Sequence, residues 1–146
     1  MKIIFKVSFT VMTLAFLSSC ITGPQAIDYG NDGCHFCSMT IVDKIHGAEL
    51  ITDKGKVFKF DATECMLHYL NENTALPIGS LLTNYYEAPI AFVETKEATF
   101  LICEKLPSPM GANLTAFKTK ESAEKVMEEQ GGKLYTWDAL KMHLKN

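Results

Sequence analysis

The chain has 146 residues, of which 47% are hydrophobic and 21% are charged, a composition typical of a globular domain. Its formal net charge is −3, and all 14 basic residues are lysines. Arginine supplies most bidentate contacts to phosphates and bases, so its absence argues against nucleic acid as a partner.

The first 20 residues have the pattern of a bacterial lipoprotein signal. Lys2 and Lys6 precede an apolar run that is too short and too early for a good membrane span, and the leader ends in Leu-Ser-Ser-Cys. We expect residues 1–19 to be removed and Cys20 to be acylated, which would anchor an extracytoplasmic domain to a bacterial membrane. An ordinary signal peptide with an unrelated cysteine is the alternative. Cleavage reduces the chain from 146 to 127 residues, enough for one compact mature domain.

The first half of the mature chain predicts a tether followed by strands and a helix. Residues 20–32 carry Pro, Gly, Asn and Asp without an apolar period, so we expect a tether there. Asp53-Lys54-Gly55 predicts a hairpin turn, and Asp61 is expected to cap a helix over 62–70 with Glu64 in a capping box. The β-rich segments predict strands at residues 40–42, 48–52, 57–60 and 81–89.

The second half resembles the first in the order of its elements. Residues 90–95 and 98–104 are expected to pair as strands around a turn at Lys96-Glu97, and 105–113 to form a loop rich in Pro and Gly. A short strand, a helix, a strand and a terminal helix follow at residues 114–117, 119–132, 133–137 and 138–146. We therefore predict an α+β fold of two similar ββαβ modules, residues 33–87 and 88–146.

Cys34 and Cys37 form a C-x-x-C pair in the run GCHFCSMT, and several kinds of site share this spacing. A structural zinc site normally needs four ligands, but Cys65 and Cys103 stand alone and are expected to be buried apolar residues. A c-type haem needs His directly after the second Cys, where this chain has Ser. A thiol oxidoreductase places the pair before a helix, whereas the residues that follow here favour a strand. A structural disulfide between the two cysteines stays open beside these alternatives.

Cys37 and Met39 suggest a different chemistry. In an extended chain residues i and i+2 point the same way, so a thiolate and a thioether would converge, and such soft donors select Cu(I). Met110 is the best candidate for a third ligand, because Pro109 and Gly111 place it in a loop and not on a helical apolar face. Met66 and Met127 fit helical apolar faces, and Met142 is expected to be structural as well.

His35 and His46 are further candidates for the metal site. The sequence shows no Ser-His-Asp set and no carboxylate pair, so we expect a protein that is not an enzyme.

The segments CHFCSM, FDATECM and PMGANLTAF, together with the lipoprotein signal, resemble the NosL-type nitrous oxide reductase accessory lipoproteins over most of the mature chain. The resemblance implies an extracytoplasmic Cu(I)-binding copper chaperone with two ββαβ modules. It implies Cys37, Met39 and Met110 as metal ligands. As partners it implies a copper-accepting reductase and a membrane transporter complex. Cys34 departs from the family motif, which needs one cysteine, and is either an extra ligand or a redox lock on Cys37.

Overall fold

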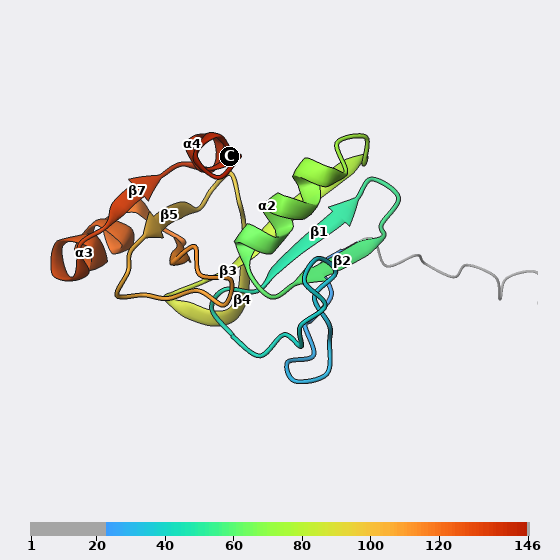
Figure 1. The fold of residues 1–146 in the computed structure, drawn as a ribbon, viewed down its shortest axis with the longest axis horizontal. Helices are drawn as coiled ribbons and strands as arrows, with labels where there is room; N and C mark the ends of the chain where they lie inside the picture. Colours follow the sequence, from blue (N-terminus) through green and yellow to red (C-terminus); the bar gives the residue numbers. More distant parts are fainter. Residues whose placement is uncertain (1–22, 146) are drawn as a thin grey trace, which may run out of the picture.

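A computed structural model describes residues 23–145 of the chain (Figure 1). The signal sequence and the predicted lipid-attachment site Cys20 lie outside the described residues. The elements in chain order are β1 (Ala48–Thr52), β2 (Val57–Phe60), α2 (Thr63–Glu72), β3 (Ile78–Tyr85), β4 (Ala88–Glu94), β5 (Thr99–Ile102), β6 (Leu114–Phe117), α3 (Lys120–Gln130), β7 (Lys133–Tyr135) and α4 (Trp137–His143).

Two antiparallel sheets repeat one topology. The four-stranded sheet has the order β2-β1-β3-β4, and the three-stranded sheet has the order β6-β5-β7. In each sheet the first strand of the unit is flanked by the second, and a helix then leads to the strand on its other side. The α+β fold with two similar ββαβ modules is thus confirmed, as β1-β2-α2-β3 and β5-β6-α3-β7.

The expected pairing of residues 90–95 with 98–104 is wrong. β4 pairs with β3, Leu82 opposite Glu94 and Thr83 opposite Val93, while β5 pairs with β6 and β7. A short turn joins β3 directly to β4, so this local hairpin forms in preference to the predicted one. Residues 88–94 therefore extend the first sheet, and the boundary between the sheets falls near residues 95–98.

One hydrophobic core joins the two modules. Phe60 from β2 and Phe100 from β5 are both fully buried in it, and burial of such a side chain is worth about 1.5–3 kcal/mol. Helix α2 lies along the first sheet, and α3 and α4 lie beside the second (Figure 1). Met66 is buried as predicted, whereas Met142 is 71% exposed, so its predicted structural role is wrong.

Residues 25–32 are not the free tether that their composition suggested. Ile27 is buried in the core, and the Tyr29 hydroxyl donates to the side chain of Asn84 in β3 at 2.7 Å. Lys59 in β2 donates to the Ala26 carbonyl at 2.7 Å and forms an ion pair with Asp32. The polar composition gave no sign that Ile27 is buried or that side-chain hydrogen bonds and an ion pair hold this segment against the first sheet.

Helix α2 begins without the capping box that we expected. Its N-cap is Ala62, which has no side chain to donate or accept, and Asp61 is buried with Oδ1 unpaired. Glu64 is also buried, bonded to Ser108 of the 103–113 loop. The hairpin turn at residues 53–55 is confirmed, with Gly55 at φ 80°. Within residues 23–145, no helix is both long and apolar enough to cross a bilayer.

Candidate metal centre

The cysteine-rich run forms a tight turn closed by its own backbone. Gly33 and Thr40 make an isolated antiparallel bridge, and the Cys34 amide donates to the Met39 carbonyl at 2.8 Å. The Ser38 amide donates to the Cys34 carbonyl at 3.0 Å, and Ser38 has φ 63°. The chain at Cys37 to Met39 is therefore a turn, so the expected extended geometry is wrong. Left-handed φ is uncommon outside glycine and is held here by the surrounding hydrogen bonds.

Three thiols meet at this turn. The sulfurs of Cys34, Cys37 and Cys65 all lie within 4.8 Å of one another, and none is in a disulfide. Cys34 and Cys37 come from the turn and Cys65 from the first turns of α2. Cys34 is 4% exposed, Cys65 is fully buried and Cys37 is half-buried. We call these three residues the thiol cluster.

Cys65 is the member of the thiol cluster that the sequence reasoning missed. Its burial was predicted, because it belongs to the apolar face of α2. Its partners lie about thirty residues earlier in the chain, and no local spacing marks them. The only sequence signal for Cys65 is the segment FDATECM, which places this cysteine just after β2. Cys103 behaves as predicted: it is buried in the smaller core cluster, with its thiol 3.6 Å from the Gln130 carbonyl.

Hydrogen bonds set the charge distribution in the thiol cluster. The Cys65 thiol donates to the Cys34 sulfur, and this bond lowers the pKa of Cys34 to about 4 despite its burial. The backbone amides of Asp61, Cys37 and Phe36 act in the same direction. The pKa of Cys65 is raised by the same bond and by burial, and burial raises the pKa of Cys37. Cys34 is therefore the thiol of the cluster that ionises most easily, and Cys37 and Cys65 hold their protons more tightly.

This donor set suits a soft ion of low coordination number. Across residues 23–145, no fourth Cys, His, Asp or Glu joins the three thiols in a group of metal-binding geometry. Structural zinc normally takes four ligands, whereas thiolates and thioethers are the donors that select Cu(I). Cys65 does not stand alone as we expected, but a fourth Cys, His, Asp or Glu ligand for zinc is missing from the described residues.

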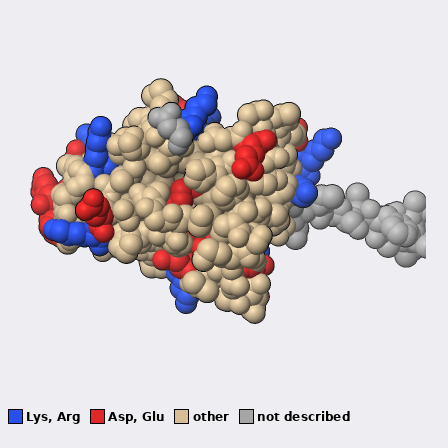
Figure 2. All heavy atoms as spheres, viewed as in Figure 1, with Lys and Arg blue, Asp and Glu red and all other residues tan. Residues whose placement is uncertain are grey.

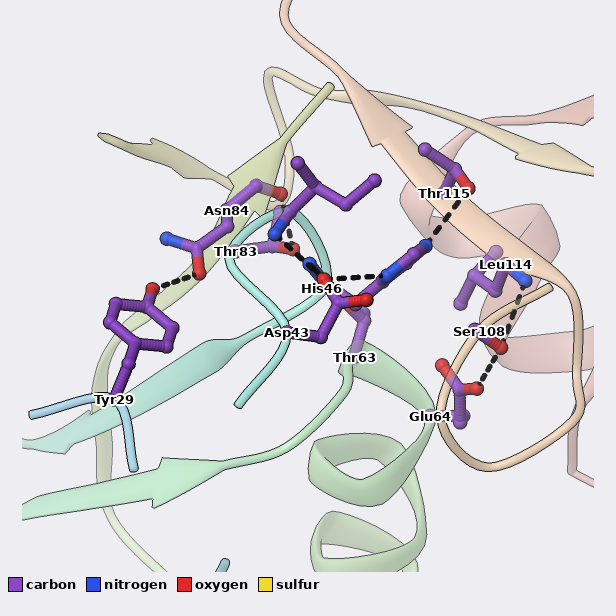
Figure 3. A network of polar contacts seen from close by, with 11 residues as sticks. Tyr29, Asp43, His46, Thr63, Glu64, Thr83, Asn84, Ser108, Leu114 and Thr115 are labelled. Atoms are coloured by element: carbon purple, nitrogen blue, oxygen red, sulfur yellow. Dashed lines mark hydrogen bonds and ion pairs between the residues drawn. The ribbon is translucent and has the colours of Figure 1, made fainter. Parts of the chain in front are cut away.

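The two predicted thioether ligands lie at the surface. Met39 is 51% exposed and follows the turn directly. Met110 is 37% exposed in the 103–113 loop, which is fastened to the start of α2 by the bond from the Ser108 hydroxyl to Glu64, the neighbour of Cys65. Figure 3 shows this bond and the second bond of Ser108, from the Leu114 amide at 3.2 Å. The fold thus attaches the Met110 loop to the helix that carries one of the thiols.

The two histidine candidates have other partners. His35 is exposed, packs edge-on against Phe58, and its Nδ1 lies 3.2 Å from the backbone of Lys59. His46 is 4% exposed and lies between the modules, with Nε2 3.2 Å from the Thr115 hydroxyl (Figure 3). The Asp43 carboxylate lies 3.0 Å from its Nδ1, close enough for an ion pair but poorly aligned for a hydrogen bond. Neither histidine belongs to the thiol cluster.

With this geometry in place, the comparisons with known proteins decide the family. The profile of the NosL family matches residues 25–144, nearly the whole described chain. The chain belongs to the NosL family. The matched range begins within the segment that we expected to be a tether, in agreement with its packing against the first sheet.

A solved NosL structure has the same fold. The crystal structure of the copper chaperone NosL from Shewanella denitrificans superimposes with a TM-score of 0.69 and 28% sequence identity, and the match covers 80% of this chain and 94% of that one. No curated protein matches the sequence. The chain belongs to the NosL family, and the solved NosL structure that it resembles is that of a copper chaperone. Both findings agree with the expectation that the chain is not an enzyme.

Proposed function

We propose that this NosL protein is an extracytoplasmic Cu(I)-binding chaperone anchored to the membrane through lipidated Cys20. The observation that carries the proposal is the thiol cluster, in which three sulfurs lie within 4.8 Å of one another. The structural relative from Shewanella denitrificans is a copper chaperone, which supports copper as the cargo. Cu(I) is favoured over zinc by the soft sulfur donors, and because no fourth Cys, His, Asp or Glu joins them in the part of the chain that the structure describes.

The exposure of the site suits a carrier. Cys37 is half-buried and Met39 is exposed, so a ligand from a second protein can reach an ion held there. A site of two or three ligands can accept an incoming ligand before an old one leaves, and this permits transfer without free copper. Cys37, Met39 and Met110 remain the predicted ligands, with Cys34 as an additional donor.

The partners follow from the family resemblance. The resemblance of the sequence to nitrous oxide reductase accessory lipoproteins supports delivery of copper to that reductase. The anchor at Cys20 would hold the domain beside a membrane transporter complex that loads it. On the face shown in Figure 2, lysines and acidic residues are interspersed, so recognition of these partners does not depend on a broad patch of one charge there.

A thiol-disulfide oxidoreductase is the second candidate, and the low pKa of Cys34 favours it. Its attacking thiolate must reach the substrate disulfide, but Cys34 is only 4% exposed, and the more accessible Cys37 has a raised pKa. We therefore expect no reduction of insulin disulfides. Insulin reduction that is abolished by Cys34→Ser would favour the oxidoreductase.

An anaerobic competition titration tests the proposed function. The mature domain is titrated with Cu(I) in the presence of a chromophoric Cu(I) chelator, and in parallel with zinc. We expect the domain to withdraw Cu(I) from the chelator and Cys37→Ser to withdraw much less. Zinc binding without preference for Cu(I) would contradict the proposal.

A further inference from the structure

The three thiols of the cluster and the two predicted thioether ligands differ widely in exposure. Met39 is 51% exposed and Met110 is 37% exposed, whereas Cys34 is 4% exposed and Cys65 is fully buried. Cys37 is intermediate, and its sulfur lies within 4.8 Å of both buried thiols. It also accepts a hydrogen bond from the Met39 amide, two residues away. Cys37 is thus a half-buried thiol that lies beside the buried thiols of Cys34 and Cys65 and is bonded to the backbone of the exposed Met39.

We propose that the protein has two Cu(I) positions that share Cys37. The outer position is formed by Cys37 with the exposed thioethers of Met39 and Met110, and the inner position by Cys34, Cys37 and Cys65. The inference rests on the proposed function, because it takes Cu(I) as the cargo. It adds Cys65 as a ligand. It also assigns entry of Cu(I) to the outer position and retention of Cu(I) to the inner position.

The inner position is built to hold the ion more tightly than the outer one. The amides of Asp61, Cys37 and Phe36 already point at the Cys34 sulfur, so hydrogen bonds that stabilise a metal-bound thiolate are in place before the metal arrives. In the inner position thiolates replace neutral thioethers, and the attraction between Cu(I) and a thiolate is strengthened where water is excluded. Three sulfurs suffice for a trigonal Cu(I) site, and within residues 23–145 no further Cys, His, Asp or Glu joins them.

Movement between the positions is an exchange of ligands without a redox change. At the outer position the Cys37 thiol loses its proton to solvent as its bond to Cu(I) forms. When the ion moves inward, the bonds to the thioether sulfurs break and bonds to the Cys34 and Cys65 sulfurs form. Any protons still held by the Cys34 and Cys65 thiols pass to solvent as these bonds form, and copper remains Cu(I) throughout.

The chain offers a matched pair of cysteines to test the inner position. Cys65 and Cys103 are both buried, but only Cys65 belongs to the thiol cluster. In anaerobic competition titrations we expect Cys65→Ser to weaken Cu(I) binding by about tenfold or more, and Cys103→Ser to leave it unchanged. Cys34→Ser, which alters a loop and not a helix, should weaken binding as Cys65→Ser does. Thermal unfolding of each apo variant separates lost ligands from lost structure.

Exchange kinetics test the outer position. We expect the Met39→Leu/Met110→Leu double variant to release Cu(I) to a chelator about tenfold more slowly than the unaltered domain, because the ion must then leave the inner position without the exposed thioethers. Equal affinities for Cys65→Ser and Cys103→Ser would overturn the inner position. Unchanged release in the methionine variant would overturn the outer one. Either result leaves the proposed function standing, provided that the unaltered domain binds Cu(I); if it does not, the proposed function itself fails.

Discussion

Ser108→Ala should destabilise the domain strongly, although it removes a single oxygen atom. The Ser108 hydroxyl donates to Glu64 at the start of α2 and accepts the Leu114 amide at 3.2 Å, and all three residues are buried. The substitution leaves a buried carboxyl oxygen and a buried amide without these partners. Glu64 Oε2 is already unpaired, so the carboxyl group would keep no side-chain bond. An unsatisfied buried group costs about 1–3 kcal/mol, and we therefore expect a loss of about 3 kcal/mol.

Ser80→Ala is the matched control, because Ser80 makes the same kind of bond to Glu94 at the surface of the first sheet. A surface bond is replaced by water, so we expect a loss of about 0.5 kcal/mol or less. Urea unfolding of the apo domain measures both variants. If Ser108→Ala unfolds within about 0.5 kcal/mol of Ser80→Ala, then the bond does not fasten the Met110 loop to α2, and the reasoning is wrong.

Three other predictions follow from the structure. Burial raises the pKa of Glu49, in the middle of β1, from 4.5 to about 7, so the folded state binds the proton more tightly and loses stability as the pH rises across this range. A change of this size corresponds to about 3 kcal/mol, so Glu49→Gln should require a higher urea concentration for unfolding than the unaltered domain at about pH 8 but not at about pH 4.5. A difference that does not vary with pH would refute this. Cys20→Ala should abolish acyl labelling and release the protein from the membrane fraction; retained labelling would exclude Cys20 as the lipid site. Gly132→Ala should destabilise the domain by about 2 kcal/mol or more in urea unfolding, because Gly132 has φ 104° and an added Cβ would lie 2.4 Å from the Ile102 carbonyl oxygen; unchanged stability would show that the backbone relaxes there.

The parts of the fold that could be predicted are those with local signals. The turn at residues 53–55 contains the glycine that its positive φ requires, and Thr119, where we expected a helix to begin, is the N-cap of α3 and accepts the Ser122 amide. The order of strands and helices follows from such signals in both halves. This is why the repeated module was visible despite little residue identity.

The errors concern contacts between distant segments. Residues 25–32 lack an apolar period, yet Ile27 finds a place in the core and Tyr29 bonds to Asn84, more than fifty residues away. Asp61 has the residue type and spacing of a cap, but it is buried and helix α2 begins at Thr63 with Ala62 as its N-cap. β4 could form a hairpin either with β3, as it does, or with β5, as we expected. No local signal in the sequence decides between these two pairings.

The candidate site was predicted in part for the same reason. The C-x-x-C pair is local, and both of its thiols belong to the cluster. Cys65 comes from another element, and a cysteine on the apolar face of a helix has the pattern of a core residue. The sequence suggests copper through an extended Cys37–Met39 pair, but the chain turns at Ser38 and this pair is not extended. The structure supports copper through three converging thiols instead.

Copper K-edge X-ray absorption of the Cu(I)-loaded domain tests the central claim most directly, because it reports the atoms that hold the ion. We expect a first shell of sulfur alone, with the edge shape of two- or three-coordinate Cu(I), which Cys37→Ser would alter. A first shell dominated by nitrogen or oxygen would contradict the assignment of copper to the thiol cluster.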